Sequence, residues 1–354
     1  MRYLPRPLRH ILRKPYRRIA RKAILRRWYQ LVFRIVFGRM ATSEENELLA
    51  QCVREHPTGI DPSPFRTVLS LFDQKSCPTP FTVRLSAADV RVVDYDGVKI
   101  ATDIAEPVIS YGIERATYEQ HMIRFFRCIL RPGMTMVDVG ANIGLFALLA
   151  AKLVGETGHV YAIEPRGENA RLLLYSAQIN NFANIHLLPT AVGNITGYTI
   201  YQNHIGANGA LMTKTSADAA YDSQAILHPT AQVVPMARLD DLVTGPVDVL
   251  KLDIEGAEGM ALCGALKLIR NYRPLITSEA SVEMLDRVSN MPLRDYLLLT
   301  RSLDYRQFVI DRHDGHLVEI QDLDQFLLEW PDPCHIEDFA FIPQEKMASL
   351  DLPL

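Results

Sequence analysis

The sequence is poor in cysteine and has no long apolar segment. Its five cysteines are scattered through 354 residues and none forms a CxxC pair. A disulfide framework or a cysteine-based zinc site is therefore not expected, and a reducing compartment is favoured. No stretch reaches the roughly 18 consecutive apolar residues that indicate a membrane-spanning helix. The HExxH and HxH pairs of histidine-based metal sites are also absent, and we expect no metal cofactor. Because carboxylates suit Mg²⁺, assistance by a metal stays open.

Acidic residues are missing from the first 40 positions, which contain thirteen lysines and arginines. The whole chain has a net charge of −3, so the remaining residues carry −16. A basic arm on an acidic body indicates an anionic partner for the arm, either lipid headgroups or nucleic acid. The stretch after Pro15 favours an interfacial helix on an anionic membrane, and a helix packed on the body stays open. The acidic body disfavours nucleic acid.

The chain is predicted to contain three segments. Residues 1–40 form the basic amphipathic arm, residues 41–75 a small helical module, and residues 76–354 the main domain. Within that domain, residues 76–116 are predicted to be rich in strands, because apolar and polar residues alternate there and an Asp-Gly pair indicates a turn. Residues 117–345 form its core.

The core alternates between apolar strands and helices. Strands are predicted at 134–140, 159–165, 184–193, 247–256 and 273–280, with a further pair at 305–311 and 337–343. Continuous apolar strands separated by helices predict an α/β fold, with a mostly parallel sheet covered on both faces. The last two strands have no clear helix between them, which indicates an antiparallel edge.

The motif VDVGANIG, residues 137–144, ends one predicted strand and begins a helix. Gly140 and Gly144 permit a tight turn, and the helix start offers free N–H donors. Glu164 ends the next strand, where its carboxylate can accept both hydroxyl protons of a ribose. This combination predicts nucleoside-cofactor binding at the switch point of a doubly wound sheet.

The spacing Gly140-x-Asn142-x-Gly144 differs from the GxGxxG of dinucleotide sites. Asp138 also puts a negative charge where a pyrophosphate would be unfavourable. An acid there suits a ligand that carries an ammonium and a sulfonium. The turn therefore favours S-adenosylmethionine as the cofactor.

Four blocks together resemble the FkbM-type family of S-adenosylmethionine-dependent methyltransferases: VDVGANIGLFALLAA, VYAIEP, LKLDIEGAEGMALCGA and YRPLITSEAS. The resemblance covers about residues 110–345 and includes the lead-in YGIERATYEQ. It implies a class I, Rossmann-like fold with a seven-stranded sheet, and O-methylation of hydroxyls on sugars, glycolipids or polyketides. Its cofactor residues would be Glu119, Asp138, Gly140, Asn142, Gly144, Glu164, Ala191, Val192 and Asp253.

Methyl transfer requires alignment of donor and acceptor, and a hydroxyl acceptor benefits from a base. Asp253, at the end of the fourth strand, is the best-placed carboxylate, although it could instead contact the methionine ammonium. Glu255 and Glu279 lie on the same rim. Glu258 could serve the helix start through the helix dipole.

The connection 193–246 is too long for a simple loop, and we expect a hairpin within it. The strands YTIYQNH and AQVVPMARL would flank a small-residue segment that forms an acceptor-binding lid. His204 in this segment is a further candidate base.

These features predict a methyltransferase (EC 2.1.1.-) that acts on a hydroxyl of a sugar, glycan or glycolipid. It would be cytoplasmic and peripheral on the membrane, with the basic arm on an anionic surface. Two alternatives stay open: an RNA methyltransferase that uses the arm, and a non-catalytic membrane adaptor with a methyltransferase-like domain. The sequence does not specify the oligomeric state.

Overall fold

The computed structural model describes residues 90–103, 109–203, 209–212 and 231–348. The chain divides into a unit of residues 1–83 and a unit of residues 84–354, and the described residues all belong to the second. The predicted arm and helical module therefore lie outside the described residues. Among the described residues, no helix has the length and apolar character needed to cross a membrane.

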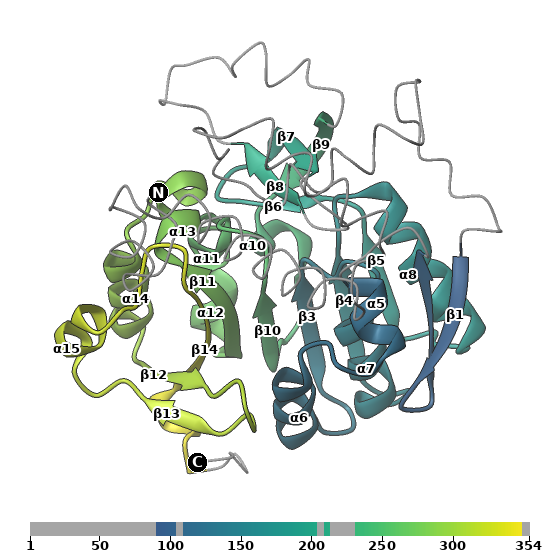
Figure 1. The fold of residues 1–354 in the computed structure, drawn as a ribbon, viewed down its shortest axis with the longest axis horizontal. Helices are drawn as coiled ribbons and strands as arrows, with labels where there is room; N and C mark the ends of the chain where they lie inside the picture. Colours follow the sequence, from purple (N-terminus) through teal and green to yellow (C-terminus); the bar gives the residue numbers. More distant parts are fainter. Residues whose placement is uncertain (1–89, 104–108, 204–208, 213–230, 349–354) are drawn as a thin grey trace, which may run out of the picture. The chain divides into compact units, whose positions relative to one another are not determined.

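An eight-stranded sheet forms the centre of the described unit (Figure 1). Five neighbouring strands are parallel, in the order β11, β10, β3, β4, β5. Their bounds are Leu275–Ser281 for β11, Val249–Leu252 for β10, Thr135–Val139 for β3, His159–Ile163 for β4 and Ile185–Leu188 for β5. The predicted parallel α/β core is confirmed.

Three more strands extend the sheet beyond β11. They are β14 (Ile336–Pro343), β12 (Tyr305–Ile310) and β13 (Leu317–Glu319). Strand β14 runs antiparallel to both β11 and β12, and β13 runs antiparallel to β12 at the edge. The antiparallel strand β14 is thus internal, and the short β13 makes eight strands where seven were expected.

Successive side chains of each buried strand point to opposite faces of the sheet, and an apolar cluster covers each face. On one face, Met136 and Val160 pack with α5 (Ile109–Glu114), α6 (Gln120–Ile129), α7 (Leu145–Val154) and α8 (Gly167–Ile179). On the other face, Val137 and Leu250 pack with α10 (Leu239–Leu242), α11 (Glu258–Cys263), α12 (Leu266–Tyr272), α13 (Val282–Ser289), α14 (Leu293–Ser302) and α15 (Leu323–Leu328). A one-turn 3-10 helix, Gln344–Lys346, follows β14.

Two smaller β structures accompany the main sheet. Strands β1 (Val90–Tyr95) and β2 (Val98–Asp103) form a hairpin whose turn has positive φ at Asp96 and Gly97, as the Asp-Gly signal predicts. A four-stranded sheet has the order β6, β9, β7, β8. Its bounds are Ala191–Val192 for β6, Gly197–Asn203 for β7, Gly209–Met212 for β8 and Ala231–Ala237 for β9. The antiparallel β7–β9 pair confirms the predicted hairpin.

Candidate active site

A cavity of about 210 Å³ lies at the carboxyl ends of the parallel strands β3, β4 and β10. Ligands of open α/β sheets bind at this edge because the loops that follow neighbouring parallel strands converge there. Most of the residues predicted for the site line this cavity. They are Glu119, Gly140, Asn142, Glu164, Ala191, Val192, Asp253, Glu255 and Glu279.

The turn between β3 and α7 packs directly against the end of β10. Gly140 has φ +84°, and a Cβ atom there would lie 1.9 Å from the backbone oxygen of Asp253. Gly144 has φ +99°, and its Cβ would lie 2.7 Å from Cγ of Leu173 on α8. Only glycine fits either position. Gly140 shapes the cavity wall, whereas Gly144, which is not a lining residue, permits α7 and α8 to approach each other.

Glu164 ties this turn to the end of β4. Its Oε2 accepts the N–H of Asn142 at 2.9 Å, and its Oε1 accepts the N–H of Arg166 at 2.8 Å. The residue is 4% exposed, and burial raises the pKa of its carboxyl to about 7 against the opposing backbone hydrogen bonds. Each carboxylate oxygen keeps a second lone pair for a ligand hydroxyl.

Asp138 lies beneath the cavity and is not among the residues that line it. The residue is fully buried, and neither carboxylate oxygen has a hydrogen-bond partner among the described residues. Its ion-pair partner is Lys251, whose Nζ lies 3.6 Å from Oδ1. Direct cofactor contact by Asp138 stays a prediction, and the contact that the structure gives it is this lysine.

The three acids of the motif LDIEGAE have separate positions. Asp253 and Glu255 line the cavity. Glu258, the first residue of α11, is 1% exposed, and its Oε1 accepts the N–H of Ile254 at 2.8 Å. Burial raises the pKa of Glu258 to about 8 and that of Glu255 to about 7. Glu258 therefore stabilises the turn before α11, and the other two acids face the ligand space.

Two acids approach the same cavity from other elements. Glu119 precedes α6, and its pKa is raised to about 7 by burial, with Asp253 adding to the effect and Lys251 opposing it. Glu279 on β11 has its pKa raised well above the ordinary value by burial and then by Asp253. Arg312 lies 3.8 Å from Glu279 and 3.2 Å from Asp338. The cavity is therefore strongly acidic.

Strained backbone occurs at three points of this cavity. Nine described residues other than glycine have positive φ, and three of them line the cavity: Glu119, Asn142 and Glu255. A residue with a side chain pays about 1 kcal/mol or more for this conformation. Each of the three is a polar residue in the loop that leads into a helix. Such clustering is typical of functional sites.

The sequence analysis missed several lining residues, and Lys251 is the most important. It lies in the middle of β10 between two buried leucines, where a lysine interrupts an otherwise apolar strand. That interruption was a usable signal, since an interior lysine requires charged partners. The other missed residues carried no such signal. Tyr118 and Phe146 adjoin predicted residues, whereas Tyr201, Leu211 and Ile336 come from distant segments.

The predicted lid is described only in part. Tyr201 of β7 and Leu211 of β8 line the cavity, so this connection does reach the site. His204, the candidate base in the same connection, lies outside the described residues.

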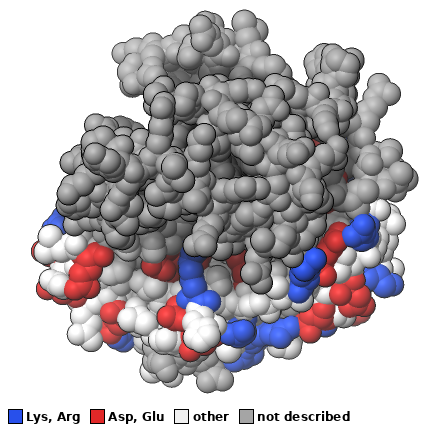
Figure 2. Space-filling view, in the orientation of Figure 1, with Lys and Arg blue, Asp and Glu red and all other residues white. Residues whose placement is uncertain are grey.

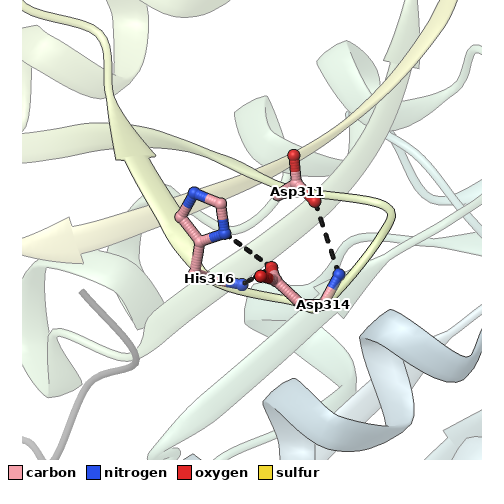
Figure 3. Close-up of side chains that lie close together, drawn as sticks. All are labelled: Asp311, Asp314 and His316. Atoms are coloured by element: carbon pink, nitrogen blue, oxygen red, sulfur yellow. Dashed lines mark hydrogen bonds and ion pairs between the residues drawn. The ribbon is translucent and has the colours of Figure 1, made fainter.

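A separate group of possible metal ligands lies in the turn between β12 and β13 (Figure 3). Asp311 Oδ1 accepts the N–H of His313 at 2.8 Å, and Asp314 Oδ1 accepts the N–H of His316 at 3.0 Å. Both contacts are the local side chain to backbone bonds by which aspartates stabilise turns. These bonds account for the arrangement, and none of the three ligands is a cavity residue.

The residues of the cavity fit S-adenosylmethionine. Glu164 offers a buried acceptor at the end of β4, and the turn at Gly140 lets the backbone approach a ligand closely. The carboxylates of Asp253 and Glu119 provide the negative charge that an ammonium and a sulfonium require. The first residues of α7 close the site on one side.

Comparisons with known proteins agree with this assignment. Residues 138–329 match the family model described as the Methyltransferase FkbM domain. A solved structure of methyltransferase FkbM from Methylobacillus flagellatus KT is 18% identical over 62% of this chain and 50% of that chain, with a TM-score of 0.37. This chain thus spans half the length of that protein. No curated protein matches the sequence.

Two other solved structures show similarity at the same level. A SAM-dependent methyltransferase from Aquifex aeolicus is 15% identical over 61% of this chain and 92% of that chain, with a TM-score of 0.32. A Streptococcus mutans protein, described as a methyltransferase and solved in complex with SAH, is 10% identical over 62% of this chain and 94% of that chain, with a TM-score of 0.35. The match to the family model covers more than half of the chain, and the chain therefore belongs to the FkbM family of S-adenosylmethionine-dependent methyltransferases.

Proposed function

We propose that this methyltransferase acts on a hydroxyl of a sugar, glycan or glycolipid, at the cytoplasmic face of a membrane. One observation carries the proposal. Three carboxylates from adjacent strand ends, Asp253, Glu255 and Glu279, line the same cavity as the cofactor turn and Glu164.

The chemistry explains why carboxylates suit this position. S-adenosylmethionine supplies the methyl group when bound. An acceptor hydroxyl must lose its proton as its oxygen gains that methyl group, and a carboxylate within hydrogen-bond reach can take the proton. Asp253 is our candidate for this base, because Lys251 donates a hydrogen bond to its Oδ2 at 2.8 Å. That hydrogen bond holds the carboxylate in place at the cavity.

The other cavity acids suit the recognition of several hydroxyl groups. The pKa of Glu255 is raised to about 7, chiefly by burial, so near neutral pH its carboxyl can either accept or donate hydrogen bonds. Glu279 and Tyr201 add further polar groups on the same wall. A sugar presents several hydroxyls to such groups, whereas a phosphate-rich acceptor would be repelled by them.

The charge distribution also favours a small acceptor over RNA. In Figure 2, basic and acidic side chains are interspersed on the described part of the visible face. A nucleic-acid surface usually has a continuous basic stripe that contacts phosphates. The thirteen basic residues of the arm remain the one feature that favours RNA. A non-catalytic adaptor is disfavoured because the glycine turn, Glu164 and Asp253 are all present at one cavity.

The variant Asp253→Asn tests the proposed base. We expect it to bind S-adenosylmethionine in calorimetry with little change in affinity and to lose turnover by about 10²–10⁴-fold, the usual contribution of general-base catalysis. Since the acceptor is not identified, turnover is followed in cells. Mass spectrometry of envelope glycans from a deletion strain should show the loss of one methyl group, which the wild-type gene restores and Asp253→Asn does not.

The matched control is Glu258→Gln in the same motif. Its amide oxygen can accept the N–H of Ile254 as the carboxylate does, and residue 258 does not line the cavity. We expect this variant to restore the methyl group. Unchanged glycans in the deletion strain, together with a methyl group lost from RNA, would contradict the sugar acceptor. Loss of cofactor binding in Asp253→Asn would make Asp253 a cofactor ligand instead.

A further inference from the structure

The most unusual residue of the described unit is the buried lysine of β10. The Lys251 side chain is 4% exposed. It lies opposite Asp138 in the register of the parallel β3–β10 pair, and two positions before Asp253, the residue that directly follows the strand. Side chains two positions apart on a strand point to the same face. The topology therefore places an acid, a lysine and a second acid next to one another.

The three charged groups form a short chain of contacts. Lys251 Nζ lies 2.8 Å from Asp253 Oδ2 and 3.6 Å from Asp138 Oδ1. The same ammonium lies 5.0 Å from the centre of the Phe146 ring, in the arrangement of a cation–π contact. Asp138 is fully buried, whereas the Asp253 side chain is 25% exposed and lines the cavity. Lys251 thus connects a buried carboxylate to the one at the ligand space.

This arrangement is not needed to fill the space. A methionine has a similar length and could pack on Phe146, and apolar replacements of buried ion groups often keep or increase stability. The lysine is itself a poor candidate for the base. Burial opposes its charge, but Asp253, Asp138 and Glu119 together raise the pKa of Lys251 above its ordinary value, so it stays an ammonium at neutral pH.

We infer that Lys251 is a positioning residue that opposes protonation of the buried Asp138 carboxylate and holds one oxygen of Asp253 by a hydrogen bond. The hydrogen bond occupies Oδ2 and leaves Oδ1 to accept a proton. Burial raises the pKa of Asp138 and the Lys251 ammonium opposes that rise, so removal of the ammonium favours the protonated form of Asp138. This role deepens the proposed function, because its catalytic consequence depends on Asp253 as the base, but the ionisation can be measured without an acceptor.

Four other acids surround Asp253, and the charge of each would repel its carboxylate, whereas Lys251 attracts it. Glu119 precedes α6, Glu255 lies in the loop after β10, Glu258 begins α11 and Glu279 lies on β11. Lys251 is the single cation among the described residues that line the cavity.

The test compares full-length wild type with Lys251→Met and Lys251→Gln. Proteins with ¹³C-labelled aspartate carboxyl groups are followed by NMR, and Asp138→Asn and Asp253→Asn identify the two signals. We expect the Asp138 carboxyl to titrate at higher pH in each Lys251 variant than in wild type, because the ammonium that favours its ionised form is gone. Lys251→Gln retains a polar side chain, so it supplies the measurement if Lys251→Met does not fold.

Two further readouts separate positioning from a structural role. Binding of S-adenosylhomocysteine, measured by calorimetry, should stay within about tenfold of wild type in a folded variant, because the turn at Gly140 and Glu164 are unchanged. The glycan methyl group should be lost in cells at neutral pH and partly restored by Lys251→Arg. An Asp138 signal that titrates at the same pH in wild type and in the Lys251 variants would overturn the inference, whatever the glycans show. Altered titration of Asp138, with glycans that are unchanged even in the deletion strain, would support the inference and contradict only the proposed acceptor.

Discussion

At the scale of single residues, the acids of the LDIEGAE motif differ because their surroundings differ. Asp253 has an ammonium at hydrogen-bond distance, whereas Glu258 is enclosed and bonded only to the backbone. The same side-chain chemistry thus serves the cavity in one place and a buried turn in the other. The sequence analysis assigned separate roles to these acids, which stay predictions, and it overlooked Lys251, the hydrogen-bond donor to Asp253.

Glu258 gives a measurable dependence of stability on pH. Its folded pKa, about 8, is raised above the ordinary value of 4.5 by burial. The folded state therefore holds a proton that the unfolded state releases, so this group lowers the free energy of unfolding as pH rises from about 4.5 to about 8. We expect Glu258→Gln to remove this contribution, on the order of 3–5 kcal/mol across that range.

The measurement is urea unfolding of wild type and Glu258→Gln at several pH values. The other buried acids titrate in both proteins, so the difference between the two curves reports on residue 258. The variant should gain stability relative to wild type as pH rises. A constant difference from pH 5 to pH 8 would show that Glu258 is ionised throughout and that the proposed neutral state is wrong.

At the scale of elements, the β3–α7 turn depends on contact with the end of β10. Gly140→Ala would place a Cβ 1.9 Å from a backbone oxygen at φ +84°. Overpacking and backbone strain each cost about 1–3 kcal/mol, so we expect a loss of about 2–5 kcal/mol in the free energy of unfolding. We also expect cofactor affinity to fall at least about tenfold, because the cavity wall must shift.

Gly167→Ala is the matched control for this change. Gly167 begins α8, and a Cβ there would meet open space. Alanine favours helix over glycine by about 0.5–1 kcal/mol, so the control should be as stable as wild type or slightly more so. Thermal unfolding and calorimetry with S-adenosylmethionine check both variants. Equal cofactor binding by the two would show that the turn does not shape the site.

The predictable elements were those whose signal is local. Alternating apolar strands and helices gave the parallel core, and Asp96-Gly97 gave the hairpin turn. The place of β14 between β11 and β12 depends on pairing between distant segments, which no local pattern specifies. The same holds for Tyr118, Tyr201 and Ile336, which reach the cavity from three separate parts of the chain. Cofactor contact by Asp138 stays a prediction, and its place beside Lys251 follows from the register of β3 with β10.

At the scale of the whole molecule, the separation of charge predicts salt-dependent attraction to membranes. Residues 1–40 carry +13, and the rest of the chain carries −16. We expect full-length protein to float with vesicles of phosphatidylserine at low salt, and not with vesicles of neutral phosphatidylcholine. Binding should weaken as salt rises, because ions screen charges beyond about 10 Å at 0.1 M.

A full-length variant with Arg17, Arg18, Arg21 and Lys22 changed to glutamine tests the arm. Loss of four charges near a membrane surface, at about 1 kcal/mol each, should abolish flotation. A second variant, with four exposed basic residues outside the arm changed in the same way, serves as control: Lys99, Arg115, Arg131 and Arg171. Equal flotation of the two variants would remove the membrane role from the proposal.

The internal position of β14 also affects the order in which the sheet can form during synthesis. During synthesis, β11 is complete at residue 281, but the strand that covers its free edge begins only at residue 336. Until then the nascent sheet exposes the unpaired N–H and C=O groups of a seven-residue strand, which is a template for pairing with other chains. The sheet of this methyltransferase domain can therefore be completed only after β14, Ile336–Pro343, is synthesised. The solubility of the nascent domain depends on how soon these residues follow β11.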